Sequence, residues 1–182
     1  MNFHELFQLE GVTIKKEKGE HVFMQGDSDK SLYFIQSGLL KAYYTSEDGK
    51  ESVKSFLLSN NIIGSLTSSY SEGVCSFSLL CLESTVLIKT PFKSLWEHSK
   101  KDMEIANEMI EFLLRFAMKK EKREYELLCL SAEERFCILE NNSPSLLEKV
   151  TQNDLARYLG VTPVGLCRII KRTHNKKFLS SS

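Results

Sequence analysis

The chain has 182 residues, of which 42% are hydrophobic and 26% are charged, and its acidic and basic side chains are equal in number. This composition is typical of a folded globular protein and excludes an intrinsically disordered one. The first twenty residues hold several acids, and no apolar run approaches the length of a membrane-spanning helix. The sequence therefore predicts a cytoplasmic protein with no membrane partner and with its five cysteines reduced.

Charge is distributed unevenly along the chain. Residues 150–182 contain six basic side chains and one acid, Asp154, whereas residues 1–149 contain 18 basic and 23 acidic side chains. A basic module attached to an acidic body favours an anionic partner for the C-terminal segment. A solvated charged tail would have the same composition, so the choice between a tail and a module that binds an anionic partner depends on how the charges are arranged.

Short strands separated by glycines are predicted between Gly11 and Lys89. The strands are rich in β-branched and aromatic residues, and Asp48-Gly49 between two of them is a strong hairpin signal. The predicted strands are 12–16, 21–24, 31–37, 39–45, 52–58, 76–82 and 85–89. Strands of this length and spacing predict a sandwich or a barrel-like roll, and the fold expected for this segment is an antiparallel β-roll of the jelly-roll type.

Two helices are predicted after the roll. Pro91 is expected to start a short one that runs to residue 98, and residues 100–128 lack Gly and Pro and predict one long helix. The long helix could pack on its own roll or join two copies of the chain, and its position between a roll and a basic module favours a homodimer. The three- and four-residue spacing of a coiled-coil seam is followed by Met103, Ala106, Ile110, Leu113 and Ala117.

Capping signals divide the C-terminal segment into short helices. Ser131 and Glu134 form a Ser-x-x-Glu capping box, and the helix that they start is expected to end at residues 141–144. Thr151 and Asp154 form a second capping pair, which predicts a helix that begins at Gln152.

A three-residue turn is predicted after that helix. Gly160 can take the left-handed conformation that ends it, and Thr162 then caps another helix whose first residue is Pro163. Two short helices joined by such a turn form a helix-turn-helix motif. The crevice between them is expected to be filled by Leu155, Ala156, Leu159, Val161, Leu166 and Ile169.

The outer face of the second helix is predicted to enter the major groove of DNA. Basic residues gather on it and acids are missing, which a helical hairpin used only for packing would not explain. Arg168 is expected to read a base, because a guanidinium can bind O6 and N7 of guanine together. The residues expected to contact DNA are Thr162, Pro163, Val164, Cys167, Arg168, Lys171, Arg172 and Lys176.

The order of roll, long helix and helix-turn-helix resembles the Crp–Fnr superfamily of bacterial transcription regulators over nearly the whole chain. GEHVFMQGDSDKSLYFIQSGLLKAYYTSEDGKE resembles the family's cyclic-nucleotide-binding-type domain, and TQNDLARYLGVTP with LCRIIK resembles its recognition segment. The resemblance implies a homodimer joined along the long helices, with each recognition helix in one half-site of a near-palindromic double-stranded operator. RNA polymerase is a further candidate partner.

The predicted fold is of the α+β class and has three parts. Residues 1–98 form a sensor domain, residues 99–128 a dimerisation helix, and residues 129–182 the DNA-binding domain. We expect no enzymatic activity, no catalytic residues and no metal. A metal-dependent β-roll enzyme would need converging histidines, and the roll has only His21. A ligand-binding module without DNA binding is the other alternative, against which the helix-turn-helix argues.

The roll departs from the nucleotide-binding members that it resembles. They hold the ribose with a Gly-Glu pair and the cyclic phosphate with an Arg-Ser pair, where this chain has Gly64-Ser65 and Cys75-Ser76. The first arginine of the chain is Arg115, so the roll lacks a guanidinium for the phosphate. Gly64, Ser65, Cys75 and Ser76 are therefore candidates for an effector pocket whose ligand is unknown and is not expected to be cyclic AMP.

Other departures concern cofactors and the operator. The first cysteine is Cys75, so the N-terminal cysteine cluster of the oxygen-sensing branch is missing and an iron–sulfur cofactor is not expected. A haem would need a placed His or Met, and His21 and Met24 on a predicted strand are expected to be ordinary surface and core residues, so no haem is expected either. A buried free thiol is the expected role of Cys75, with oxidant sensing as the alternative. Val164 replaces the family's usual glutamate in the recognition helix, so the operator is not expected to follow the family's usual sequence.

Overall fold

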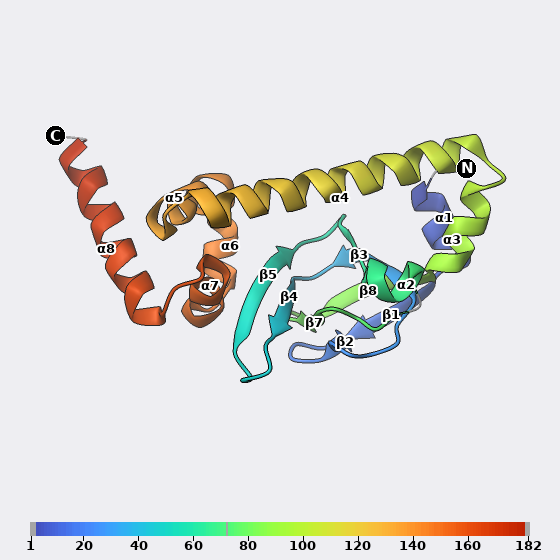
Figure 1. Cartoon of the computed structure of the whole chain (residues 1–182), viewed down its shortest axis with the longest axis horizontal. Helices are drawn as coiled ribbons and strands as arrows, with labels where there is room; N and C mark the ends of the chain where they lie inside the picture. Colours follow the sequence, from blue (N-terminus) through green and yellow to red (C-terminus); the bar gives the residue numbers. More distant parts are fainter. Residues whose placement is uncertain (1–2, 72, 181–182) are drawn as a thin grey trace. The chain divides into compact units, whose positions relative to one another are not determined.

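The computed structural model describes residues 3–71 and 73–180, without the side chains of Phe3, His174 and 176–180 (Figure 1). The chain divides into two compact units, Met1–Phe116 and Ala117–Ser182. Helix α4 (Met103–Cys129) contributes residues to both of them. No helix in the described ranges is long and apolar enough to cross a membrane.

The first unit contains a β-roll made of two four-stranded antiparallel sheets. All seven predicted strands are confirmed, and a short further strand that was not predicted, β6, pairs with β3. One sheet has, in spatial order, β1 (Val12–Lys16), β8 (Thr85–Pro91), β3 (Ser31–Ser37) and β6 (Ile62–Ile63). The other has β2 (His21–Phe23), β7 (Ser78–Cys81), β4 (Leu40–Thr45) and β5 (Glu51–Leu57).

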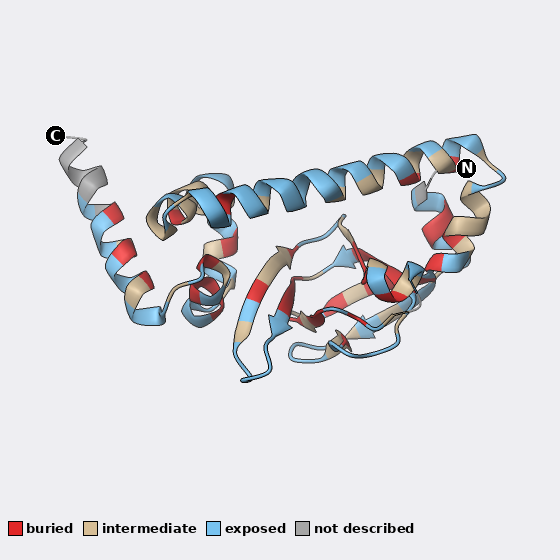
Figure 2. Ribbon diagram, viewed as in Figure 1, coloured by how far each residue is buried: buried red, intermediate tan, exposed pale blue. Residues whose placement is uncertain are grey.

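Strand β3 is buried on both of its faces (Figure 2). Tyr33 and Ile35 belong to the core of the roll, together with Leu79 of the other sheet. Side chains of a strand alternate between faces, so Leu32 and Phe34 point the other way and join a second apolar cluster. That cluster is completed by three helices, which contribute Leu6, Phe7, Phe92, Leu95, Ile105 and Met109.

The helices of the first unit differ in part from the predicted ones. Helices α1 (Phe3–Glu10) and α2 (Leu66–Tyr70) were not predicted. Helix α3 spans Phe92–Ser99, one residue later than predicted, because Pro91 ends strand β8. The long helix begins at Met103 rather than at residue 100, since the Asp102 carboxylate accepts a hydrogen bond from the backbone N–H of Glu104 at 2.9 Å.

The second unit consists of the C-terminal part of α4 and four further helices. Its core contains Phe136, Leu155, Ala156, Leu159, Leu166 and Ile169. The capping box of Ser131 and Glu134 is confirmed, and Pro144 begins a new helix after α5 ends. The four helices are α5 (Ala132–Asn142), α6 (Pro144–Lys149), α7 (Gln152–Leu159) and α8 (Pro163–Ser180).

Candidate nucleic-acid interface

The predicted helix-turn-helix is formed by α7, a three-residue turn and α8. The hydroxyl of Thr151 accepts a hydrogen bond from the backbone N–H of Asp154 at 3.1 Å and so caps α7. Gly160 ends that helix with φ +70°, the left-handed conformation that glycine adopts without strain. The hydroxyl of Thr162 accepts from the N–H of Gly165 at 3.1 Å and caps α8, whose first residue is Pro163.

Helix α8 has a buried face and an exposed face. Leu166 and Ile169 are buried in the core of the second unit, which holds the helix against α7 and Phe136 of α5. The residues predicted to meet DNA lie on the exposed side: Thr162, Pro163, Val164, Cys167, Arg168, Lys171 and Arg172 are all exposed. The side chain of Lys176 lies outside the described residues.

Two contacts join the exposed face to neighbouring helices. The thiol of Cys167 lies 3.7 Å from the side-chain oxygen of Gln152, the first residue of α7. The guanidinium of Arg172 lies 3.6 Å from the carboxylate of Glu133 on α5. The sequence singled out neither Gln152 nor Glu133 as part of the interface, because both contacts join residues far apart in the chain.

The four candidate effector residues of the roll lie close together. The hydroxyl of Ser65 is buried and accepts a hydrogen bond from the backbone N–H of Ser76 at 3.3 Å. A Cβ atom on Gly64 would lie 2.6 Å from both the Leu32 side chain and the Ser31 carbonyl, so only glycine fits. Cys75 is 1% exposed, its thiol lies 3.8 Å from the Asp29 carbonyl oxygen, and Ser76 is exposed.

Asp29, whose carbonyl oxygen contacts the Cys75 thiol, also accepts three hydrogen bonds through its side chain. Its carboxylate accepts hydrogen bonds from the Ser31 N–H at 2.9 Å and from the Tyr33 hydroxyl and the Lys89 ammonium at 2.8 Å each. Burial by itself would raise the pKa of this carboxyl, but the hydrogen bonds outweigh it and lower the pKa. Among the described residues, no group of three or more His, Cys, Asp or Glu side chains is arranged to hold a metal ion.

Known proteins resemble this chain in both units. The family model of the cyclic nucleotide-binding domain matches residues 13–102. The fumarate and nitrate reduction regulatory protein of Salmonella typhi is 28% identical over 198 residues, which cover 99% of this chain and 77% of that protein. The electron transport regulator A of Shewanella oneidensis is 27% identical over 186 residues, 94% of this chain and 74% of its own length.

A solved structure extends the comparison to the fold. FixK2 from Bradyrhizobium japonicum superposes with a TM-score of 0.74 at 16% sequence identity, and the match covers 92% of this chain and 86% of FixK2. The matched domain, the relatives along nearly the whole chain and the shared fold support a transcription regulator of the Crp–Fnr type.

These similarities confirm the resemblance to the Crp–Fnr superfamily drawn from the sequence and the predicted α+β fold. The relatives are transcription regulators, which are not enzymes. This confirms the prediction of no enzymatic activity and removes the metal-dependent β-roll enzyme as an alternative. The function class is that of a DNA-binding transcription regulator.

Proposed function

We propose that this Crp–Fnr regulator binds a near-palindromic operator as a homodimer and reads its sequence with α8. The observation that carries the proposal is the division of α8 into a buried face of Leu166 and Ile169 and an exposed face with Arg168, Lys171 and Arg172. Arg168 lies in the N-terminal half of α8, the part of a recognition helix that contacts base edges. Lys171 and Arg172 lie further along and are assigned to phosphates.

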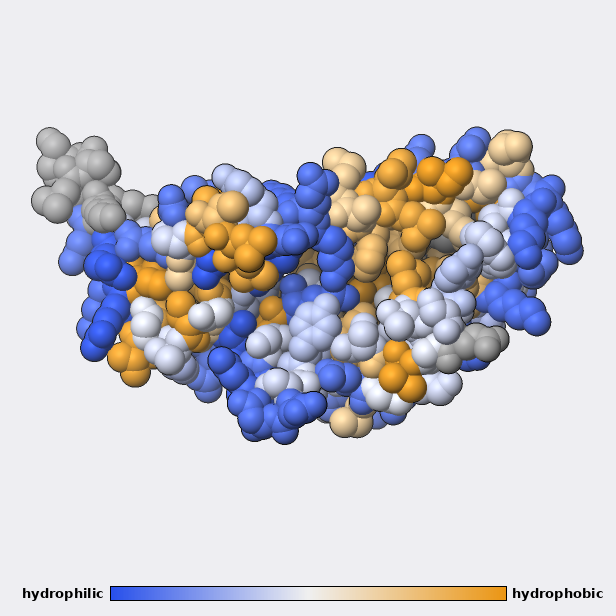
Figure 3. Space-filling model, in the orientation of Figure 1, coloured by the Kyte–Doolittle hydropathy of each residue, from blue (hydrophilic) through white to orange (hydrophobic). Residues whose placement is uncertain are grey.

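An exposed apolar line on α4 supports the homodimer. Ile110 is 54% exposed and Leu114 is 57% exposed, while Ile105 and Met109 on the other side of the helix are buried against the first unit. Apolar side chains gather over the N-terminal half of α4 in the space-filling view (Figure 3). The exposed apolar residues of this line are Met103, Ile110, Leu114 and Met118.

This line shares Met103 and Ile110 with the predicted seam but continues through Leu114 in place of Leu113. Leu113, predicted to face a partner, is half-buried and packs against the apolar cluster of the first unit. Leu114 takes its place on the exposed side. We therefore assign the dimer contact to the line through Ile110 and Leu114, because residues four apart share a helix face.

The roll is proposed to act without cyclic AMP or cyclic GMP. Cys75 stands where nucleotide-binding members carry arginine, and it is buried in the core of the roll rather than directed to a ligand. A thiol in this position cannot supply the bidentate contact that an arginine makes to a phosphate. Titration calorimetry with either nucleotide is expected to show no heat of binding at micromolar protein, and a micromolar dissociation constant would contradict the proposal.

The place of action follows from the partner. Operator DNA lies in the bacterial cytoplasm, which is the proposed location, and RNA polymerase is the proposed further protein partner at a promoter. The effector, if the roll takes one, is a small molecule that contacts the region of Gly64, Ser65 and Ser76.

Selection from random DNA tests the proposed function. The purified chain is incubated with random duplexes, and bound duplexes are recovered and sequenced over several rounds. We expect near-palindromic sequences with half-sites about one helical turn, roughly 34 Å, apart. Recovery of no enriched sequence by the folded protein would contradict the proposal.

A further inference from the structure

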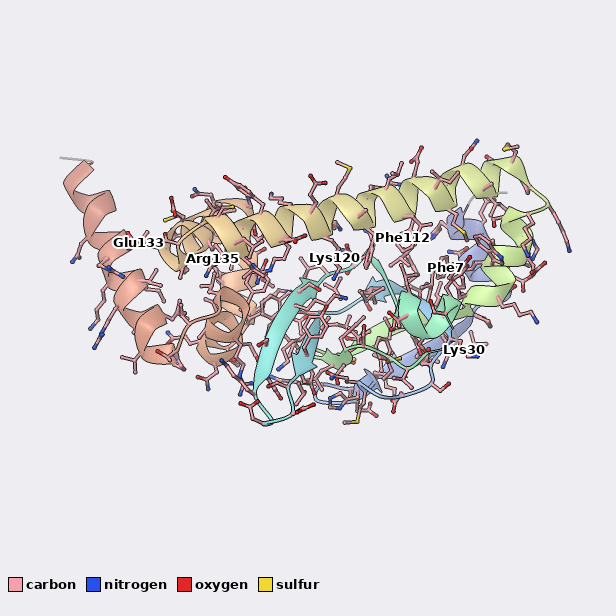
Figure 4. The ribbon with its side chains drawn as sticks, viewed as in Figure 1. Phe7, Lys30, Phe112, Lys120, Glu133 and Arg135 are labelled. Atoms are coloured by element: carbon pink, nitrogen blue, oxygen red, sulfur yellow. The ribbon has the colours of Figure 1, made fainter. Side chains whose placement is uncertain are left out.

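Two arginines in the second unit donate hydrogen bonds to backbone carbonyls near the ends of two helices. Arg135 of α5, labelled in Figure 4, donates from Nη2 to the carbonyl of Leu159 at 2.8 Å and from Nη1 to that of Glu126 at 3.2 Å. It also donates to the carbonyl of Leu130, just after α4. Arg123 of α4 donates from Nη2 to the carbonyl of Tyr158.

Two of the acceptors, the carbonyls of Tyr158 and Leu159, have no partner within their helix, whereas the Glu126 carbonyl also accepts from the Leu130 N–H at 3.3 Å. The last four carbonyls of an α-helix have no partner within the helix, and cations are favourable at this end. Tyr158 and Leu159 are the last two residues of α7, and Glu126 lies in the last turn of α4. Because a guanidinium carries five N–H donors in one plane, one arginine can bond two helix ends at once.

Arg123 is also stacked and largely buried. Its Cζ atom lies 3.9 Å from the centroid of the Tyr158 ring, and its side chain is only 17% exposed. Glu126, itself buried, places a carboxylate oxygen 3.8 Å from Nη1 and supplies the opposite charge. A buried cation is costly unless it is paired and hydrogen-bonded. The contacts of Arg123 with Glu126 and Tyr158 offset that cost, so Arg123 differs from an arginine in a solvated surface ion pair.

Arg135 lies directly at the turn of the helix-turn-helix. A Cβ atom added to Gly160 would be 4.0 Å from its Nη2. The two arginines thus join the C-terminal part of α4, the start of α5 and the end of α7. Helix α8 follows that end after only three residues.

We propose that Arg123 and Arg135 are positioning residues that fix the helix-turn-helix on the end of α4 and thereby set the half-site spacing that the dimer accepts. The inference rests on the proposed function, in which α4 joins the two copies and α8 enters the groove. In such a dimer the separation of the two recognition helices depends on how rigidly each motif is held at the end of α4. Loosening that attachment makes the dimer tolerant of other spacings.

The test compares the purified full-length protein on three duplexes. One is the duplex enriched by selection with the wild-type chain, and the others have one base pair added or removed between its half-sites, a change of about 3.4 Å. The variants are Arg123→Lys and Arg135→Lys, which keep the positive charge but lose the planar set of donors. Arg115→Lys is the matched control, since Arg115 is an exposed α4 residue paired with Glu111.

Fluorescence anisotropy gives the ratio of affinities for the enriched and altered spacings. Wild type and Arg115→Lys are expected to prefer the enriched spacing about tenfold or more, and each lysine variant about threefold or less. Light scattering and thermal unfolding verify that the variants are folded dimers. A lysine variant that weakens on all three duplexes by one common factor, and so keeps the full preference, would overturn the inference.

A further variant covers the case in which the lysine substitutions prevent folding. Tyr158→Leu removes the ring under Arg123 but keeps the backbone carbonyl that the guanidinium binds, and it is expected to reduce the spacing preference in the same direction. An unchanged preference in that variant also overturns the inference. If the folded wild-type chain enriches no duplex, the proposed function itself fails, which is a different result from a spacing preference that survives substitution.

Discussion

The guanidinium of Arg172 on α8 lies 3.6 Å from the carboxylate of Glu133 on α5. The arginine side chain is 62% exposed and the glutamate 23%, so this is a partly solvated ion pair at the edge of the proposed interface. Figure 4 labels Glu133 near the start of α5. A DNA phosphate that approaches Arg172 therefore also meets the negative charge of Glu133.

Glu133→Gln is expected to strengthen DNA binding. Removing the charge frees Arg172 for a phosphate, and a partly exposed ion pair is worth about 0.3–1 kcal/mol, which corresponds to roughly a two- to fivefold gain in affinity. The gain is expected on the operator and on a scrambled duplex alike, because a phosphate contact carries no sequence information. Anisotropy titrations at low salt measure it.

Glu148→Gln on α6 is the control for this change, since it removes an exposed carboxylate from a different helix of the same unit. Equal affinities of wild type and Glu133→Gln would show that Arg172 does not meet DNA.

Ile110→Glu combined with Leu114→Glu is expected to yield monomers. Each substitution removes an apolar side chain worth about 1.5–3 kcal/mol when buried, so together they raise the dimer dissociation constant by roughly two to four decades. Both residues are exposed in the single chain, so the fold is expected to persist. Light scattering over a range of protein concentrations measures the mass.

Met109→Glu on the same helix provides the contrast. Met109 is 3% exposed and packs in the apolar cluster of the first unit, so its replacement is expected to unfold that unit instead of separating dimers. A dimeric mass for the Ile110 and Leu114 double variant would place the dimer contact elsewhere.

Asp29→Asn is expected to lower the stability of the roll in a pH-dependent way. The folded pKa of Asp29 lies below its unfolded value of about 3.9, so its ionised form stabilises the fold above that pH. This stabilisation is lost as the pH falls through the folded pKa. Loss of the charged hydrogen bonds is expected to cost about 2 kcal/mol near neutral pH.

Urea unfolding at about pH 7 and about pH 3 tests this pattern. The difference between wild type and Asp29→Asn should shrink at the lower pH, because the carboxyl of the unfolded wild-type chain is then largely protonated and the charged form contributes less to stability. Glu47→Gln, an exposed loop variant, serves as the control. A difference that is as large at about pH 3 as at neutral pH would contradict the assigned role of the carboxylate.

Local signals were sufficient to predict the helix-turn-helix from the sequence. Thr151, Gly160 and Thr162 act through hydrogen bonds or backbone conformations within a few residues of themselves, and the structure shows the cap, the turn and the second cap where they were expected. The strands of the roll could be predicted equally well, because glycines mark their ends and β-branched residues their interiors.

Tertiary packing determined what the sequence did not reveal. Helix α1 is short and is held by burial of Leu6 and Phe7 against the roll, a contact with residues far along the chain. Leu113 and Leu114 are chemically alike, so only the packing of α4 decides which of them is exposed. The bonds from Arg123 and Arg135 to α7 join residues 24 to 35 positions apart and leave no local pattern.

The measurement that most directly tests α8 as the reading helix compares Arg168→Ala with Lys171→Ala on the enriched operator and on a scrambled duplex. Arg168→Ala is expected to cost about 1–3 kcal/mol on the operator, to leave the scrambled duplex nearly unaffected and to relax preference at one base pair per half-site. Lys171→Ala is expected to weaken both duplexes equally and to reduce the salt slope by about one. Anisotropy titrations at several salt concentrations give all four affinities. An equal loss on both duplexes for Arg168→Ala would make Arg168 a phosphate contact and contradict sequence reading by this helix.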